Sequence, residues 1–138
     1  MTPEQLELVQ TSYASLGDAA PEMARDFYAR LFAADPTTED LFTAGPDVMA
    51  GKFADELGAI VEAITSYETF APRVRDLAGR HIRYGVQTRH YQPLGDALIA
   101  TLAAHLETQW NPELEAAWRR AYNLVAELMM ATAASIEA

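Results

Sequence analysis

The sequence LAGRHIRYGVQTRHYQPLG, residues 77–95, carries the strongest indication of how this chain folds. It holds two of the three histidines, and it changes from helical spacing to a corner marked by Gly85 and Pro93 before helical spacing resumes. His81 follows Leu77 by four residues, so both lie on one face of a helix. Because that face is apolar, a histidine there needs a partner.

Helical spacing continues on both sides of this stretch. Apolar residues recur three and four positions apart, and proline, glycine and asparagine interrupt the pattern. Helices are expected to begin near residues 3, 21, 46, 69, 93 and 112, with a short helical turn over 38–42 and a corner at 43–45. Thr2 with Gln5 forms a capping-box pattern, and Asn111 before Pro112 is a second N-cap pattern. The sequence therefore predicts one all-α domain, residues 1–138, with six or seven helices.

The composition argues against several classes of protein. The chain has 138 residues, a formal net charge of −10 and no cysteine. A strongly acidic chain is repelled by nucleic acid, and a chain without cysteine has no disulfide or cysteine metal site. The N-terminus does not resemble a signal peptide, and no apolar run is long enough to span a membrane. We expect a cytoplasmic monomer or homodimer that has no membrane span and binds no nucleic acid.

One segment departs from this acidic composition. Within residues 73–89 a single acid, Asp76, stands among five arginines: Arg73, Arg75, Arg80, Arg83 and Arg89. One interpretation of such a cluster is a solvated helix face. The other is an anion site, which binds the carboxylates of a ligand or docks an acidic partner.

His81 also has two interpretations. It is either a core histidine bonded to a backbone carbonyl group or a metal ligand. The chain has none of the paired histidine or Asp-rich motifs of conventional metal sites. Among metals, haem iron suits a lone imidazole on an apolar face best, because the porphyrin supplies four ligands and the protein needs to supply only one.

Aromatic residues in the first half of the chain suit the walls of an apolar haem slot. They are Phe27, Tyr28, Phe32, Phe42 and Phe53. The phenylalanines are equally compatible with an ordinary core. Tyr28 differs, because a buried tyrosine hydroxyl needs a hydrogen-bond partner, and bound dioxygen would be one.

Six segments, taken in order, resemble globins, and specifically single-domain bacterial haemoglobins and the globin domain of flavohaemoglobins. They are ARDFYARLFAADP (24–36), LF (41–42), LGAIV (57–61), LAGRHIRYGV (77–86), HYQPLGDALIATL (90–102) and AAWRRAYNLVAELM (116–129). Each segment is weak evidence by itself, but the six together cover almost the whole chain at the spacing of the family. The resemblance implies the globin fold, with six to eight helices around a haem pocket.

The resemblance also implies roles for individual residues. His81 matches the proximal histidine that ligates haem iron, and Phe42 matches the phenylalanine that wedges against the haem. Tyr28 matches the distal tyrosine that donates a hydrogen bond to the bound ligand, which makes it the candidate catalytic residue. The other residues expected around the cofactor, haem b, are Met49, Lys52, Phe53, Leu77, Arg80, Val86, Tyr91, Leu94 and Leu98. Lys52 and the arginine-rich segment would reach the haem propionates.

Two positions depart from the family pattern. Met49 stands where related globins carry histidine or glutamine, and a thioether donates no hydrogen bond. Met49 could instead ligate the iron through sulfur, and Lys52 is a weaker candidate for that role. Ala133 stands where flavohaemoglobins carry a glutamate tied through a tyrosine, matched here by Tyr91, to the proximal histidine. Without that carboxylate we expect little peroxidase-type chemistry.

The resemblance implies a protein that binds gases. We expect reversible binding of dioxygen, and of NO and CO, with oxygen transport or NO dioxygenation as its activity and a separate reductase as its partner. One alternative is a six-coordinate redox or gas-sensor module with Met49 at the distal site. Another is a haem-free globin-fold interaction protein, against which the presence of His81, Phe42 and Tyr28 argues. His90 and His105 are expected to be structural, with His90 exposed at a corner.

Overall fold

The chain folds into α-helices joined by short turns. A computed structural model describes residues 1–42 and 44–137, with side chains as far as residue 136. The helices are α1 (Pro3–Leu16), α2 (Ala20–Ala34), α3 (Pro46–Ala63), α4 (Tyr67–Arg83), α5 (Tyr91–Leu106) and α6 (Pro112–Glu137). Short 3-10 helices lie at Gly17–Ala19, Pro36–Leu41, Thr88–His90 and Glu107–Gln109. The described residues form six α-helices and no strand, which confirms the predicted all-α class.

Side-chain caps begin two of these helices where the sequence predicts them. The Gln5 backbone N–H donates to Thr2 Oγ1 at 3.1 Å, and the Thr2 N–H donates to Gln5 Oε1 at 3.1 Å, so the capping box of α1 is complete. The Leu114 N–H donates to Asn111 Oδ1 at 2.8 Å at the start of α6. Each cap gives a partner to N–H groups that have none within the helix.

Two helices begin earlier than the sequence pattern predicts. α4 begins at Tyr67 rather than at residue 69. α5 begins at Tyr91 rather than at residue 93, because the 3-10 helix Thr88–His90 leads directly into it. Pro93 then lies in the first turn of α5, where a missing N–H costs no hydrogen bond. Within the expected corner at 43–45, Thr43 lies outside the described residues.

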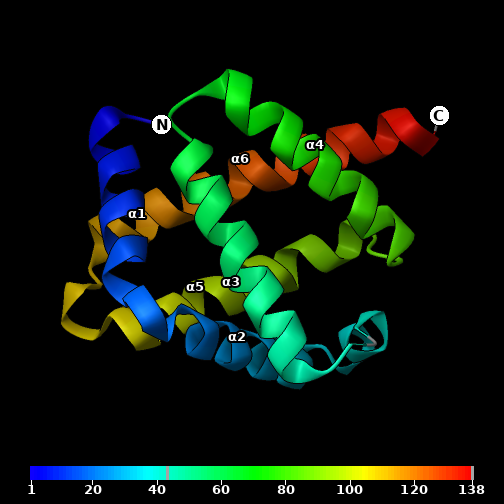
Figure 1. The fold of residues 1–138 in the computed structure, drawn as a ribbon, viewed down its shortest axis with the longest axis horizontal. Helices are drawn as coiled ribbons and strands as arrows, with labels where there is room; N and C mark the ends of the chain where they lie inside the picture. The colour runs from blue at the N-terminus through cyan, green and yellow to red at the C-terminus, as the bar shows by residue number, and fades with distance from the viewer. Residues whose placement is uncertain (43, 138) are drawn as a thin grey trace.

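The helices cross one another rather than running parallel as a bundle (Figure 1). α3 and α4 spread apart from the turn that joins them, and α5 and α6 pass behind α3 in this view. α2 packs against α3 and α5, while α4 and α1 pack against α6. The predicted site residues are therefore carried by α2 to α5 and their connections. No helix of the described chain is long and apolar enough to cross a membrane.

The largest core cluster joins α1, α2, α5 and α6. Val9, Met23, Leu31 and Leu102 are fully buried in it. Burial of each such side chain stabilises the fold by about 1.5–3 kcal/mol. The buried Trp118 indole N–H donates to Ser12 Oγ at 3.0 Å, which gives both polar groups a partner between α6 and α1. The candidate site residues lie at the edge of this core.

Candidate functional site

Aromatic side chains from three segments form a distal aromatic group, which we define as Phe27, Tyr28, Phe32, Phe42 and Phe53. The Tyr28 ring of α2 lies 5.0 Å from the Phe42 ring and 5.7 Å from the Phe53 ring, both edge-on. The Phe53 ring of α3 stacks on Phe27 at 4.5 Å. Such offset and edge-on pairs are favourable aromatic geometries. The structure thus brings together Tyr28, Phe42 and Phe53, as the sequence predicts.

The Tyr28 hydroxyl group forms no hydrogen bond within the described residues. Burial raises the pKa of Tyr28 to about 12, so the hydroxyl is protonated at neutral pH and is able to donate. The hydroxyls of Tyr13 and Tyr122 donate to the carbonyl oxygens of Ala54 and Tyr91. In contrast, the Tyr28 hydroxyl has no acceptor among the residues that the structure describes. Tyr28 therefore has a donor to offer to a ligand.

His81 lies near the end of α4 and is half-buried. Its Nδ1–H donates to the carbonyl oxygen of Leu77, one turn earlier, at 3.0 Å. This bond fixes the ring orientation and leaves the lone pair on Nε2, which is the nitrogen that can ligate a metal. Burial lowers the pKa of His81, which also favours the neutral ring. The Val86 N–H donates to the His81 carbonyl oxygen at 3.0 Å and closes the turn after the helix.

Most of the twelve residues that the sequence predicts for the site, Tyr28 and His81 included, are partly exposed. Of the twelve, Leu98 is buried, Lys52 is exposed and the rest are half-buried, although most of them are large and apolar. Leu94 packs against the main core cluster, whereas Leu77 and Tyr91 pack against a second cluster that contains Val74 and Met129. Apolar and aromatic side chains of this kind line most ligand sites in proteins.

The segment that carries Phe42 and the turn after His81 approach each other through Leu41 and Gly85. Leu41, which precedes Phe42, comes within 3.6 Å of where a Cβ at Gly85 would lie. Gly85 follows α4 with a φ of +90°, a conformation that favours glycine. This approach sets the turn after His81 beside the segment that carries Phe42. In the described residues no three His, Asp or Glu side chains come together as a metal site.

Arg80 is engaged by carboxylates. Its Nη2 pairs with Glu56 Oε1 of α3, and its Nε lies 3.2 Å from Asp76 Oδ2. Arg73 Nη1 donates to Glu56 Oε2 at 2.9 Å. The hydrogen bond that Arg80 donates to Glu56 raises the pKa of Arg80. The resemblance places Arg80 around the cofactor. In the structure two acids, Glu56 and Asp76, already lie against its guanidinium and balance its charge. Glu56 is not among the residues that the sequence predicts for this site. The sequence contains one indication of this contact: Arg73 and Arg80 lie two helical turns apart and therefore share a face of the helix, where one acid can contact both.

His90 is buried, and the prediction that it is exposed is wrong. Its side chain is 2% exposed, and its Nδ1 accepts the Gln87 N–H at 2.9 Å. The 3-10 helix turns the ring inward, where it caps this short element. His105 is half-buried, and its Nε2 lies 3.0 Å from Asp26 Oδ2, in agreement with a structural role.

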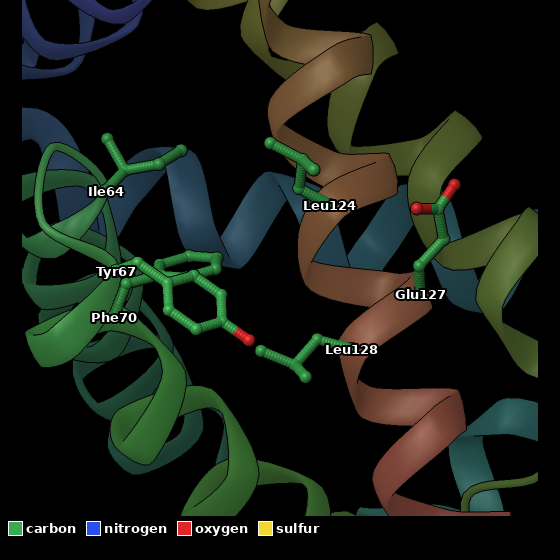
Figure 2. Close-up of a pocket in the computed structure, with 6 residues that line it drawn as sticks. All are labelled: Ile64, Tyr67, Phe70, Leu124, Glu127 and Leu128. Atoms are coloured by element: carbon green, nitrogen blue, oxygen red, sulfur yellow. The ribbon is translucent and has the colours of Figure 1, made fainter.

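A surface pocket lies outside this group of residues. It has a volume of about 380 Å³ and is lined by Ile64, Tyr67, Phe70, Leu124, Glu127 and Leu128. Figure 2 shows Tyr67 and Phe70 facing Leu124 and Leu128 of α6, with Glu127 on the far side of that helix. No residue that the sequence places around the cofactor lines this pocket.

The fold is all-α, and the candidate site combines the His81 imidazole, whose ring is oriented by Leu77, with the distal aromatic group. The globin family model matches residues 25–129, which is most of the chain. The chain belongs to the globin family, and the predicted globin fold is confirmed.

Curated relatives agree with this assignment. A flavohemoprotein of Deinococcus radiodurans is 31% identical over 134 residues, which cover 94% of this chain and 33% of that protein. A flavohemoprotein of Bordetella parapertussis is 28% identical over 134 residues with the same two coverages. An anaerobic nitrite reductase of Oryza sativa subsp. indica is 27% identical over 128 residues, or 88% of each protein. This chain spans about a third of the length of the flavohemoproteins that it matches.

Membership in the globin family implies a haem cofactor that binds small gaseous ligands, and the residues of this site fit it. The Nδ1–H of His81 is bonded to the Leu77 carbonyl oxygen, and Nε2, which has no hydrogen-bond partner among the described residues, would hold the iron. The Tyr28 hydroxyl, in the distal aromatic group, is a protonated donor whose partner is not supplied by the described chain. Apolar side chains at half burial complete the surroundings that a porphyrin needs.

Proposed function

We propose that this protein is a haem globin that reversibly binds dioxygen, and also NO and CO, through haem b ligated by His81. The observation that carries the proposal is the His81 ring, fixed by its Nδ1–H bond to Leu77 at 3.0 Å with Nε2 left for iron. When bound, the haem would supply an iron that takes a diatomic gas.

The chain's own residues divide into three tasks. Phe42, Phe53, Leu94 and Leu98 would exclude water from the cofactor, with Met49, Leu77, Val86 and Tyr91 completing the apolar lining. Tyr28 would donate its hydroxyl hydrogen to the bound gas and so slow its dissociation. Lys52, exposed on α3, balances the charge of a propionate.

The reaction that we propose is NO dioxygenation with a separate reductase. Its balance is NO + O₂ + e⁻ → NO₃⁻, so one electron must be supplied in every turnover. The flavohemoproteins among the relatives support this choice, and this chain matches only about a third of their length. Ala133 on α6 offers no carboxylate to the proximal side, which argues against a peroxidase. The cytoplasm is the compartment that we expect from the sequence.

A reductase would approach the arginines that the fold leaves exposed. Arg75, Arg83 and Arg89 are exposed and form no ion pair within the described chain, and Arg83 lies two residues after His81. The protein as a whole carries a formal net charge of −10. An acidic partner would therefore be repelled by most of the surface and attracted to this part of it.

Absorption spectra of the haem-reconstituted protein, ferric and then reduced with dithionite, test the proposal. A five-coordinate ferrous spectrum that shifts with dioxygen or CO is expected. His81→Ala should lose haem on gel filtration, while His105→Ala, which changes a histidine bonded to Asp26, should retain it. A low-spin six-coordinate spectrum in both states, abolished by Met49→Leu, would favour the redox or sensor alternative. The absence of a Soret band would overturn the proposed function.

A further inference from the structure

Glu56 joins the two helices on either side of the candidate site. Its carboxylate accepts a hydrogen bond from Arg73 at 2.9 Å and another from Arg80, so one acid of α3 holds two points of α4. The Glu56 side chain is only 18% exposed, less than either arginine. Charge-assisted hydrogen bonds of this kind are stronger and more directional than those between neutral groups.

The position of this contact matters because α3 and α4 spread apart beyond their connecting turn (Figure 1). α3 carries Met49 and Phe53, while α4 carries Leu77 and His81. Arg80 immediately precedes His81, and Asp76 Oδ2, one turn earlier, lies 3.2 Å from the Nε atom of the same guanidinium without a hydrogen bond to it. The backbone that directs the His81 ring is therefore tied to α3 through Glu56.

We propose that Glu56 is a positioning residue for the iron ligand. Through Arg80 and Arg73 it fixes the end of α4 relative to α3, and so sets how the His81 imidazole is presented. This inference rests on the proposed function, because it concerns the same haem site. An isolated surface ion pair would contribute little, but here two pairs converge on one poorly exposed carboxylate.

The test compares Glu56→Gln with Glu62→Gln in the haem-loaded protein. Glu62 lies on the same helix, is exposed and forms no ion pair within the described residues, so it is a matched control. We expect Glu56→Gln to speed haem transfer to apomyoglobin about two- to fivefold, as loss of a partly exposed ion pair implies. It should also shift or broaden the iron–histidine stretching band in resonance Raman spectra. Glu62→Gln should change neither.

Three further variants identify the path of the effect. Arg80→Gln should reproduce the spectral change, and the double variant with Glu56→Gln should add nothing if Glu56 acts through Arg80. Glu56→Asp, which retains the charge, should recover part of the wild-type band. A role in stability alone would lower the urea midpoint of Glu56→Gln and leave the band unchanged, which would overturn the inference.

The two proposals fail in different ways. If the wild-type chain binds haem normally and Glu56→Gln matches it in haem loss and in the iron–histidine band, only this inference is overturned. If the wild-type chain binds no haem, the proposed function is overturned and this inference with it.

Discussion

At the scale of the residue, the buried hydroxyl groups of Tyr13 and Tyr28 serve different purposes. Burial raises the pKa of each to about 12. Tyr13 donates to the Ala54 carbonyl oxygen at 2.6 Å and links α1 to α3. The Tyr28 hydroxyl has no such acceptor in the part of the chain that the structure describes. The first group stabilises the fold, and the second is available to a ligand.

Tyr28→Phe should raise the dissociation rate of dioxygen by about one to two orders of magnitude, since a hydrogen bond to a charged acceptor contributes roughly 1.5–3 kcal/mol. Stopped-flow displacement of dioxygen by CO measures this rate. Tyr13→Phe is the control, and it should lower the free energy of unfolding by about 1 kcal/mol with little effect on dissociation. An unchanged rate in Tyr28→Phe would remove Tyr28 from ligand binding.

His90 should make stability depend on pH. Burial, and then the neighbouring Arg89, lowers the pKa of His90, and Nδ1 must stay unprotonated to accept the Gln87 N–H. The unfolded chain therefore takes up a proton before the folded chain does. The free energy of unfolding should fall as pH drops below about 6.5, by at most about 1.4 kcal/mol per pH unit for this one group.

Urea unfolding between pH 7.5 and pH 5 measures this dependence. His90→Gln keeps an acceptor oxygen without a titrating group, so its stability should fall less steeply than that of the wild type. Carboxylates with lowered pKa values, such as Asp26 and Asp35, lose their contribution at more acidic pH and do not account for a change in this window. Equal slopes in the two proteins would contradict the assignment to His90.

At the scale of the element, the closest approach of α5 to α6 depends on one glycine. A Cβ at Gly95 would lie 2.6 Å from Tyr122 Cε2, and the Tyr122 ring is anchored by its bond to the Tyr91 carbonyl oxygen. Gly95→Ala should therefore destabilise the protein by about 1–3 kcal/mol. Gly51→Ala in α3, where nothing lies within 4 Å, should instead stabilise it by about 0.5–1 kcal/mol. Urea unfolding of both variants decides, and a Gly95→Ala protein as stable as wild type would refute the packing argument.

Helices were easier to predict from the sequence than their beginnings. The capping box at Thr2 and the cap at Asn111 are local signals, and both helices begin where these signals stand. The starts of α4 and α5 were placed two residues late. For α5 the reason is the preceding 3-10 helix, whose conformation depends on the Gln87–His90 bond rather than on apolar spacing. The same bond holds the His90 ring inward. One contact that apolar spacing does not reveal therefore accounts for two errors, the late start of α5 and the wrong exposure of His90.

For the molecule as a whole, family resemblance located the candidate site more fully than spacing did. Spacing singles out His81 and leaves open whether its partner is a carbonyl group or a metal. In the structure Nδ1 bonds the Leu77 carbonyl oxygen, and Nε2 has no hydrogen-bond partner among the described residues. The sequence shows that Arg73 and Arg80 share a face of α4 but not that Glu56 pairs with both, because that pairing depends on how α3 and α4 cross. Apart from those two arginines, residues 73–89 contain three exposed arginines that form no ion pair within the described residues: Arg75, Arg83 and Arg89.

These exposed arginines lead to a prediction about electron delivery. Reduced flavin mononucleotide carries an anionic phosphate, whereas reduced riboflavin has the same ring system without it. Arg83→Gln should slow reduction of the ferric haem-loaded protein by the first reagent about two- to threefold at low salt and leave the second unchanged. Arg120→Gln, on α6, removes the same charge from another exposed position and is the control. Near 1 M salt, where screening acts within about 3 Å, the difference should vanish. Equal slowing by Arg83→Gln and Arg120→Gln would mean that only net charge matters, and the docking role of this surface would be lost.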